Sequence, residues 1–116
     1  MVMNVLINDK KYPVEVKLTQ KAKSQGMMSR KHLDGGMLFI FNDSNEQYFW
    51  MKNCLVSLDI VFLDNGKITE IYHSCEPCES SECPTYVGYG DMVLEFLGGF
   101  CKENNLNEGD LVEFVQ

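Results

Sequence analysis

Alternation of apolar and polar residues predicts strands at the start of the chain. In PVEVKL, residues 13–18, the three apolar side chains after the proline share one face and the charged side chains lie on the other, which predicts a half-buried strand. The preceding segment MNVLI pairs with this strand across the polar NDKK, so an N-terminal hairpin is predicted. Thr19 is a favourable N-cap, and we expect a short helix over residues 20–29, which Gly26 stops or opens into a loop.

The middle of the chain contains four further predicted strands. GMLFIF, residues 36–41, is apolar on both sides, which is typical of a central strand buried on both faces. After a turn at NDSNE, the segment QYFWMKN predicts a strand with Trp50 and Lys52 on the same face. The Asn-Gly pair in DNGK favours a type I′ hairpin between residues 56–63 and 67–73.

The last third of the chain begins with a long predicted loop. HSCEPCESSECPTYVGYGD, residues 73–91, is rich in Pro, Gly, Ser and Cys, whereas MVLEFLGG predicts a strand that ends at two glycines. FCKENN predicts a helical turn, NEGD a tight turn and LVEFVQ a closing strand. Seven or eight short strands with one or two short helices predict a mostly β fold, a compact antiparallel β-sandwich or barrel.

Composition narrows the class of protein. At 116 residues the chain is long enough for one domain with a real core, so we expect a single domain over residues 1–116. The net charge of −7 and the pI near 4.7 repel phosphate backbones and anionic membranes, so neither nucleic acid nor a membrane is an expected partner. The sequence contains no secretory signal and no apolar run of about 18 residues, so we expect a soluble cytoplasmic protein or the mature part of a longer precursor.

Several segments occur in an order that resembles a known family. They are QGMMSRKHL, GGMLFIF, FWMKNCLVSLDIVFLDNGKI, CPTY, VLEFLGG and NEGDLVEF, and FWMKN followed by LDIVF is the most specific. From about Met3 to Phe114 the chain is similar to domain-of-unknown-function family 192 of bacteria and archaea. The resemblance implies a compact, jelly-roll-like β-sandwich or barrel and supplies no activity, because none is established for the family. Many relatives are exported, which makes a periplasmic or extracellular location the alternative.

Cys54 departs from the family pattern, which usually has Thr after the Asn of FWMKN. A mechanism that needs a hydroxyl at this position is therefore in doubt for this chain, and one that needs a thiol would not extend to relatives with Thr. We therefore expect Cys54 to matter least among the polar residues of this segment.

Charged residues around this segment form a candidate site. Asp59 lies in the apolar run SLDIVFL, where an unpaired carboxylate is costly, so it should pair with Arg30 or Lys52 or accept hydrogen bonds from loop amides. In the functional alternative, Arg30 and Lys52 face a cavity walled by Trp50, which suits a small anionic or planar ligand. Trp50 is also typical of a core aromatic residue. The ligand-binding candidates are Arg30, Trp50, Lys52, Asn53, Asp59 and Glu95.

The cysteines suggest a metal site or a disulfide. His73, Cys75, Cys78 and Cys83 lie close together in sequence and include a CxxC, which is a legitimate set of zinc ligands. A local disulfide between Cys78 and Cys83, or free thiols, is the competing interpretation, and the resemblance favours it because relatives often carry a similar cysteine pair just before PTY. Thiol catalysis is disfavoured because the neighbouring glutamates raise the pKa of a thiol. We expect no cofactor, with zinc as the alternative.

Three hypotheses for function follow from these features. The first is a non-catalytic binding or accessory domain for a small anionic or planar ligand or a peptide. The second is an enzyme that acts on a small or carbohydrate-like substrate through Asp59 or Glu95 with Lys52. The third is a protein-interaction module stabilised by a metal or a disulfide. The sequence contains no nucleophile elbow and no phosphate-binding loop.

Overall fold

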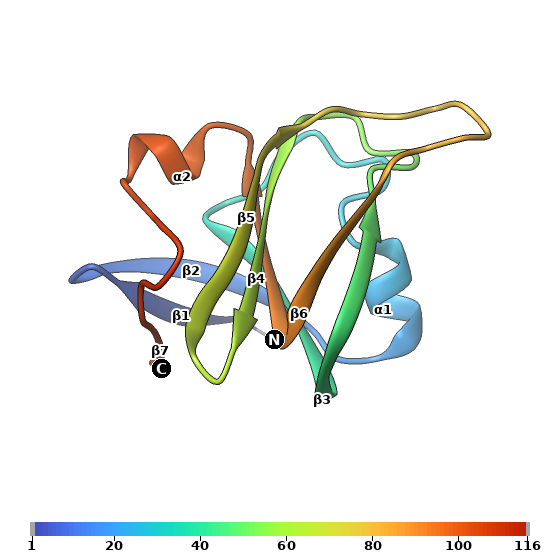
Figure 1. Cartoon of the computed structure of the whole chain (residues 1–116). Helices are drawn as coiled ribbons and strands as arrows, with labels where there is room; N and C mark the ends of the chain where they lie inside the picture. Colours follow the sequence, from blue (N-terminus) through green and yellow to red (C-terminus); the bar gives the residue numbers. More distant parts are fainter. Residues whose placement is uncertain (1, 116) are drawn as a thin grey trace.

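The computed structural model describes residues 2–115, which form one seven-stranded sheet and two short helices (Figure 1). In chain order the elements are β1 (Val2–Ile7), β2 (Lys10–Lys17), α1 (Gln20–Gln25), β3 (Gly36–Trp50), β4 (Leu58–Asp64), β5 (Lys67–Cys75), β6 (Thr85–Leu97), α2 (Phe100–Glu103) and β7 (Val112–Val115). The strand order across the sheet is β5-β4-β6-β3-β2-β1-β7. The predicted mostly β fold with short helices is therefore confirmed.

The sheet departs from the prediction in its closure and in one strand pair. It remains open rather than closing into a barrel, because β5 lies at one end of the strand order and β7 at the other. The pairs are antiparallel except for β2 and β3, which run parallel with Val14 opposite Gly36. A parallel pair needs a crossover connection, and the segment that contains α1 provides it.

Both predicted hairpins form. The turn between β1 and β2 has Asn8 and Asp9 at φ 51° and 66°, and the turn between β4 and β5 has Asn65 and Gly66 at φ 50° and 77°. Two successive residues at positive φ are the requirement of a type I′ turn, whose twist matches that of the flanking strands. Asn, Asp and Gly tolerate this conformation, which explains why the sequence signal was sufficient here.

Helix α1 is shorter than predicted. The Thr19 hydroxyl oxygen accepts a hydrogen bond from the Ala22 amide at 3.1 Å, so the N-cap lies where the sequence placed it. The helix ends at Gln25 rather than at residue 29, because Gly26 adopts φ 43° and its amide donates to the Ala22 carbonyl. The residues after Gly26 then leave the helix and pass along the sheet.

β3 is one continuous strand where the sequence predicted two strands, at residues 36–41 and 47–53. NDSNE was predicted as a turn, but β3 continues from Gly36 to Trp50 with an irregularity in its pairing to β6 between Ile40 and Asn45. β3 continues through this irregularity without ending, because it pairs with β6 both before and after it, up to Ile40 and again from Asn45. The predicted strand at residues 47–53 is therefore the second half of β3 and ends at Trp50.

The predicted loop at residues 73–91 is shorter in the structure. β5 continues to Cys75 and β6 begins at Thr85, so much of the glycine-rich part is strand. The glycines of this part are needed for close packing: a Cβ on Gly88 would lie 2.2 Å from the Phe62 ring, and one on Gly90 would lie 1.8 Å from the Leu63 carbonyl oxygen. Glycine therefore marks close approach of β6 to β4 here, not a turn.

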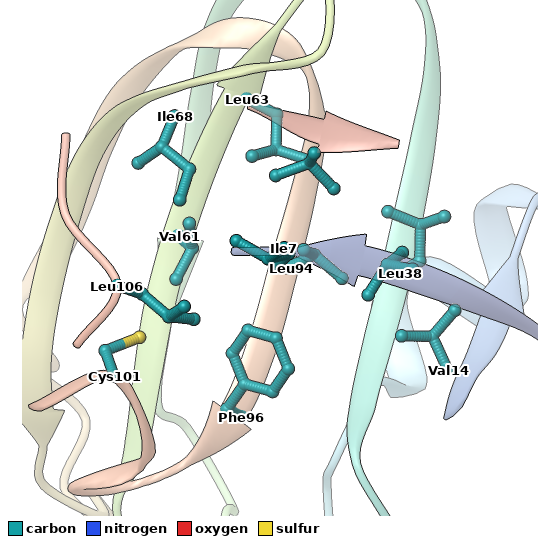
Figure 2. Packing of buried hydrophobic residues seen from close by; sticks show 12 residues of the cluster. Ile7, Val14, Leu38, Val61, Leu63, Ile68, Leu94, Phe96, Cys101 and Leu106 are labelled. Carbon is teal, nitrogen blue, oxygen red and sulfur yellow. The ribbon is translucent and has the colours of Figure 1, made fainter. Parts of the chain in front are cut away.

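Two apolar clusters cover the two faces of the central strands. Cluster one, which we term the α2-side core, packs the β1 and β2 residues against Val61 and Leu94 and reaches Cys101 of α2 (Figure 2). Cluster two, the α1-side core, contains Ile60 and Val93 on the opposite face. Since successive strand residues point to opposite faces, this arrangement decides which face each buried carboxylate meets. No helix within residues 2–115 is long and apolar enough to cross a membrane.

Candidate functional site

Asp59 serves a structural role on the α2 side of the sheet. Its side chain is fully buried, and Oδ1 accepts hydrogen bonds from the amides of Ser74 at 2.7 Å and Gly99 at 3.2 Å. Oδ2 accepts a third from the Cys101 amide at 2.8 Å. The carboxylate thus binds the first turn of α2 and the end of β5 together. Asp59 was predicted either to pair with Arg30 or Lys52 or to accept hydrogen bonds from backbone amides. The structure shows the second arrangement.

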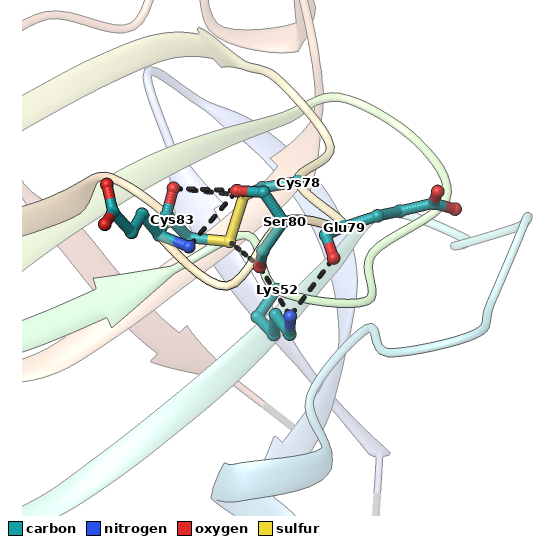
Figure 3. Close-up of a disulfide and its surroundings, with 6 residues drawn as sticks. Lys52, Cys78, Glu79, Ser80 and Cys83 are labelled. Atoms are coloured by element: carbon teal, nitrogen blue, oxygen red, sulfur yellow. Dashed lines mark hydrogen bonds between the residues drawn. A yellow bond between two sulfur atoms is a disulfide. The ribbon is translucent and has the colours of Figure 1, made fainter.

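Arg30 and Lys52 do not converge on Asp59. Arg30 Nη1 lies 2.8 Å from Glu15 Oε2 of β2, so the two side chains form an ion pair. Glu15 Oε2 accepts no hydrogen bond in this contact. Lys52 Nζ donates to the carbonyl oxygens of Glu79 at 3.2 Å and Ser80 at 2.5 Å (Figure 3). The predicted joint site of Arg30 and Lys52 is therefore not formed.

The predicted zinc ligands are not brought together. Cys78 and Cys83 form a disulfide, which removes two thiolates from the proposed set (Figure 3). Cys75 is buried at the end of β5 while His73 is exposed on the same strand. Within the described range, 2–115, no group of three His, Cys, Asp or Glu side chains is arranged to hold a metal ion.

The disulfide loop, residues 78–83, holds the segment that follows β3. The Cys78 amide donates to the Met51 carbonyl at 3.2 Å, and the Asn53 amide donates to the Cys78 carbonyl at 3.0 Å. The Asn53 carbonyl in turn accepts from the Ser29 amide at 2.9 Å. Asn53 adopts φ 60°, a conformation that asparagine tolerates better than most residues. Asn53 therefore acts through its backbone, as the junction between two loops.

Reduction of the disulfide should lower the free energy of unfolding by about 2 kcal/mol, which is the expected entropic contribution of a cross-link that closes so short a loop. The measurement is urea unfolding with and without a reductant. The Cys83→Ser variant is the matched control, because it should show the lowered stability in both conditions. Equal stability of the oxidised and reduced wild-type protein would contradict this prediction.

A cavity of about 300 Å³ lies between α1 and β3. Its wall is rich in aromatic and thioether side chains, and charged groups occur at a few points. The lining includes Lys23, Ser24, Met27, Tyr48, Phe49, Trp50, Lys52, Cys54 and Glu95. Tyr48 and Trp50 are about two-thirds and half exposed, so they lie at the surface rather than in the core. The interpretation of Trp50 as a core aromatic residue is therefore wrong.

Glu95 is the buried charged group of this cavity. Its side chain is only 4% exposed, and it points from β6 to the α1-side core together with Val93. Among residues 2–115 nothing forms a hydrogen bond or an ion pair with its carboxyl group. Burial raises the pKa of Glu95 to about 8, since the charged form is poorly solvated there. A protonated carboxyl at neutral pH is the result.

Cys54 lies beside Glu95 in the wall of the cavity. The thiol is buried, and burial followed by the charge of Glu95 raises its pKa to about 11. A thiol held in this protonated form is a poor nucleophile. The Cys54 side chain lines the same cavity as Trp50 and Lys52, and the expectation that Cys54 matters least among these residues stays a prediction.

Sequence reasoning missed the contribution of α1 to the cavity. Lys23 of α1 and Met27 after the helix line the cavity, and Lys23 Nζ lies 4.3 Å from the centre of the Phe41 ring. The apolar run VLEFL was the available signal for Glu95, since a carboxylate between apolar strand residues must meet the core on one face. No comparable local signal marks Lys23, because the sequence of a helix does not determine which part of the protein its face packs against.

Comparison with known proteins identifies the family. The model of the DUF192 family, described as "Uncharacterized ACR, COG1430", matches residues 3–114. A crystal structure of a candidate transcription regulator from Sinorhizobium meliloti 1021 superposes with a TM-score of 0.84 at 27% identity, covering 97% of this chain and 92% of that one. A protein of unknown function from Novosphingobium aromaticivorans DSM 12444 gives 0.82 at 26% identity, covering 97% and 84%. None of the curated proteins matches this chain. The chain therefore belongs to the DUF192 family, a family of uncharacterised proteins.

Proposed function

We propose that this protein is a binding domain for a small organic ligand and that the cavity between α1 and β3 is its site. The observation that carries the proposal is Glu95, a carboxyl that is 4% exposed, lines the cavity and has no partner within the described residues. A buried polar group without a hydrogen bond costs roughly 1–3 kcal/mol. A ligand in the cavity would supply the partner that this carboxyl group lacks.

The lining supports a small ligand rather than a peptide. A volume of about 300 Å³ is at the lower end of the range for ligand pockets. Aromatic side chains such as Trp50 and Tyr48 provide flat apolar surface, and Glu95 provides one polar contact that orients the ligand. This is the usual composition of a small-molecule pocket, in which a few polar groups are set in an apolar wall.

The enzyme hypothesis, in which Asp59 or Glu95 acts with Lys52, has less support, and Asp59 and Glu95 cannot act as a pair of carboxylates. The two carboxylates point to opposite faces of the sheet, because Asp59 contacts α2 and Glu95 faces the α1-side core. Two groups that act on one substrate must reach the same reacting atoms. Asp59 also accepts three backbone hydrogen bonds, which leaves it little capacity for a substrate.

Small aromatic fragments should bind in the cavity and change the fluorescence of Trp50, which is the only tryptophan of the chain. The test titrates benzylamine, benzyl alcohol and phenylacetate separately and follows Trp50 emission together with backbone amide shifts in NMR. We expect saturable binding of at least one fragment, with the largest shifts near α1, Cys54 and Glu95.

Two phenylalanine variants on α1 provide the control. Ser24 lines the cavity and is exposed, so Ser24→Phe should fill the cavity and weaken binding by about tenfold or more. Lys21 is exposed on the same helix but does not line the cavity, so Lys21→Phe should bind as the wild type does. Failure of all three fragments to bind, or full binding by Ser24→Phe, would refute the proposed site.

A further inference from the structure

We infer that the cavity selects a cationic ligand, in which a small apolar or planar body carries an amine or ammonium group that pairs with Glu95. This inference rests on the proposed function and adds the charge class of the ligand. It follows from the state of each charged and polar group around the cavity.

The two lysines of the cavity wall are already occupied. Lys23 Nζ on α1 donates to the Ile40 carbonyl oxygen at 2.8 Å and lies over the Phe41 ring. Lys52 Nζ donates to the carbonyl oxygens of Glu79 and Ser80 in the disulfide loop. An ammonium group held by carbonyl oxygens is less available to bind an anionic ligand. Both lysines keep their positive charge, but these hydrogen bonds reduce the number of N–H donors that they can offer to an anionic ligand.

Glu95 is the charged residue of the lining whose side chain forms no hydrogen bond with the described residues. The Tyr48 hydroxyl on β3 donates its hydrogen bond to Glu46 Oε1 at 3.0 Å and not to Glu95. The Cys54 thiol lies in the same cavity wall, and the charge of Glu95 contributes to the raised pKa of Cys54 and of Cys75 on β5. Burial raises the pKa of each of these two thiols to about 11, so both remain neutral at physiological pH.

The cavity wall suits a cation beyond this single ion pair. Aromatic rings attract cations through their negatively charged faces, and Lys23 over Phe41 is a cation already held in this way. Phe49 and Trp50 also contribute aromatic side chains to the lining. The net charge of −7 further raises the local concentration of cationic ligands over anionic ones. An anionic ligand would instead be repelled by Glu95 once this carboxyl group of the cavity wall is ionised.

The charge series of fragments tests the inference at about pH 7. Benzylamine, benzyl alcohol and phenylacetate have similar size but carry a positive, no and a negative charge. We expect benzylamine to bind at least about tenfold more tightly than benzyl alcohol, and phenylacetate to bind least. In Glu95→Gln the advantage of benzylamine over benzyl alcohol should disappear, because the paired charge is removed.

Glu103→Gln is the matched control, since it removes the same charge from an exposed position on α2. This variant should retain the wild-type preference for benzylamine. If benzyl alcohol or phenylacetate binds as tightly as benzylamine, the cationic class is wrong although the cavity remains a binding site. If the preference survives in Glu95→Gln, the role of Glu95 is wrong. If none of the three fragments binds, the proposed function fails as well.

The pH dependence provides an independent readout. Benzyltrimethylammonium keeps its charge at every pH, so its affinity reports only on the protein. Because a cation pairs with ionised Glu95, affinity should increase as pH rises through about 8, and binding below that pH should release a proton. Calorimetry in two buffers of different ionisation enthalpy measures this release. Affinity that falls over the same pH range would instead mean that protonated Glu95 donates a hydrogen bond to a neutral ligand, and would overturn the inference.

Discussion

Asp59→Asn should lower the free energy of unfolding by about 3 kcal/mol, the largest loss that we expect from a change of one polar atom in this protein. The carboxylate accepts three backbone hydrogen bonds, from Ser74, Gly99 and Cys101, in a fully buried position. An asparagine side chain offers only one oxygen, and its NH2 group would point at an amide donor. Urea unfolding of the wild type and the variant at neutral pH measures the difference.

Asp43→Asn is the matched control for this prediction. Asp43 is exposed on β3 and its side chain forms no hydrogen bond with other described residues, so the same chemical change should alter stability by less than about 0.5 kcal/mol. Equal stability of Asp59→Asn and the wild type would show that the carboxylate is dispensable for the fold. The conclusion that Asp59 is structural would then be wrong.

Glu95→Gln should have the opposite effect and stabilise the protein as pH rises. The folded protein keeps the Glu95 proton up to about pH 8, whereas a glutamic acid in the unfolded chain loses it near pH 4.3. Between these values the folded state binds more protons, so wild-type stability falls with increasing pH. The full difference corresponds to about 5 kcal/mol and is nearly reached at about pH 8.5. Glutamine does not titrate, so the variant should lack this loss.

The measurement compares urea unfolding of both proteins at several pH values between about 5 and 8.5. The upper limit keeps the buried thiols of Cys54 and Cys75 protonated in the folded state, where their pKa values are raised to about 11. Glu103→Gln, an exposed change of the same kind, should follow the wild type. A stability difference between Glu95→Gln and the wild type that does not grow with pH would contradict the raised pKa.

These two variants distinguish a structural role of Asp59 from a functional role of Glu95. Asp59 is satisfied by backbone amides and contributes to stability, whereas Glu95 has no such partner among residues 2–115 and costs stability when it ionises. Sites that bind ligands are often less stable than the rest of a fold, because their polar groups await a partner. The cost at Glu95 is therefore consistent with the proposed binding site.

Local sequence signals were sufficient wherever neighbouring residues decide the conformation. The N-terminal hairpin, the type I′ turn at residues 65–66 and the N-cap Thr19 were predictable, because each depends on the conformational preferences of neighbouring residues. The long β3 was not predicted, since polar residues in NDSNE are equally typical of a turn. Only the partner strand β6, which continues past the irregularity, makes this segment a strand.

The sequence by itself determined a mostly β chain with two hairpins, and it placed Asp59 in a buried strand and Glu95 in a further strand. Only the tertiary structure decided that these carboxylates meet opposite faces, because the face depends on how β4, β6 and β3 pair and on which helix covers each side. The same holds for Gly88 and Gly90, which resemble turn residues in sequence and allow close packing in space. Long-range contacts are absent from any local pattern, and the candidate site is built from them.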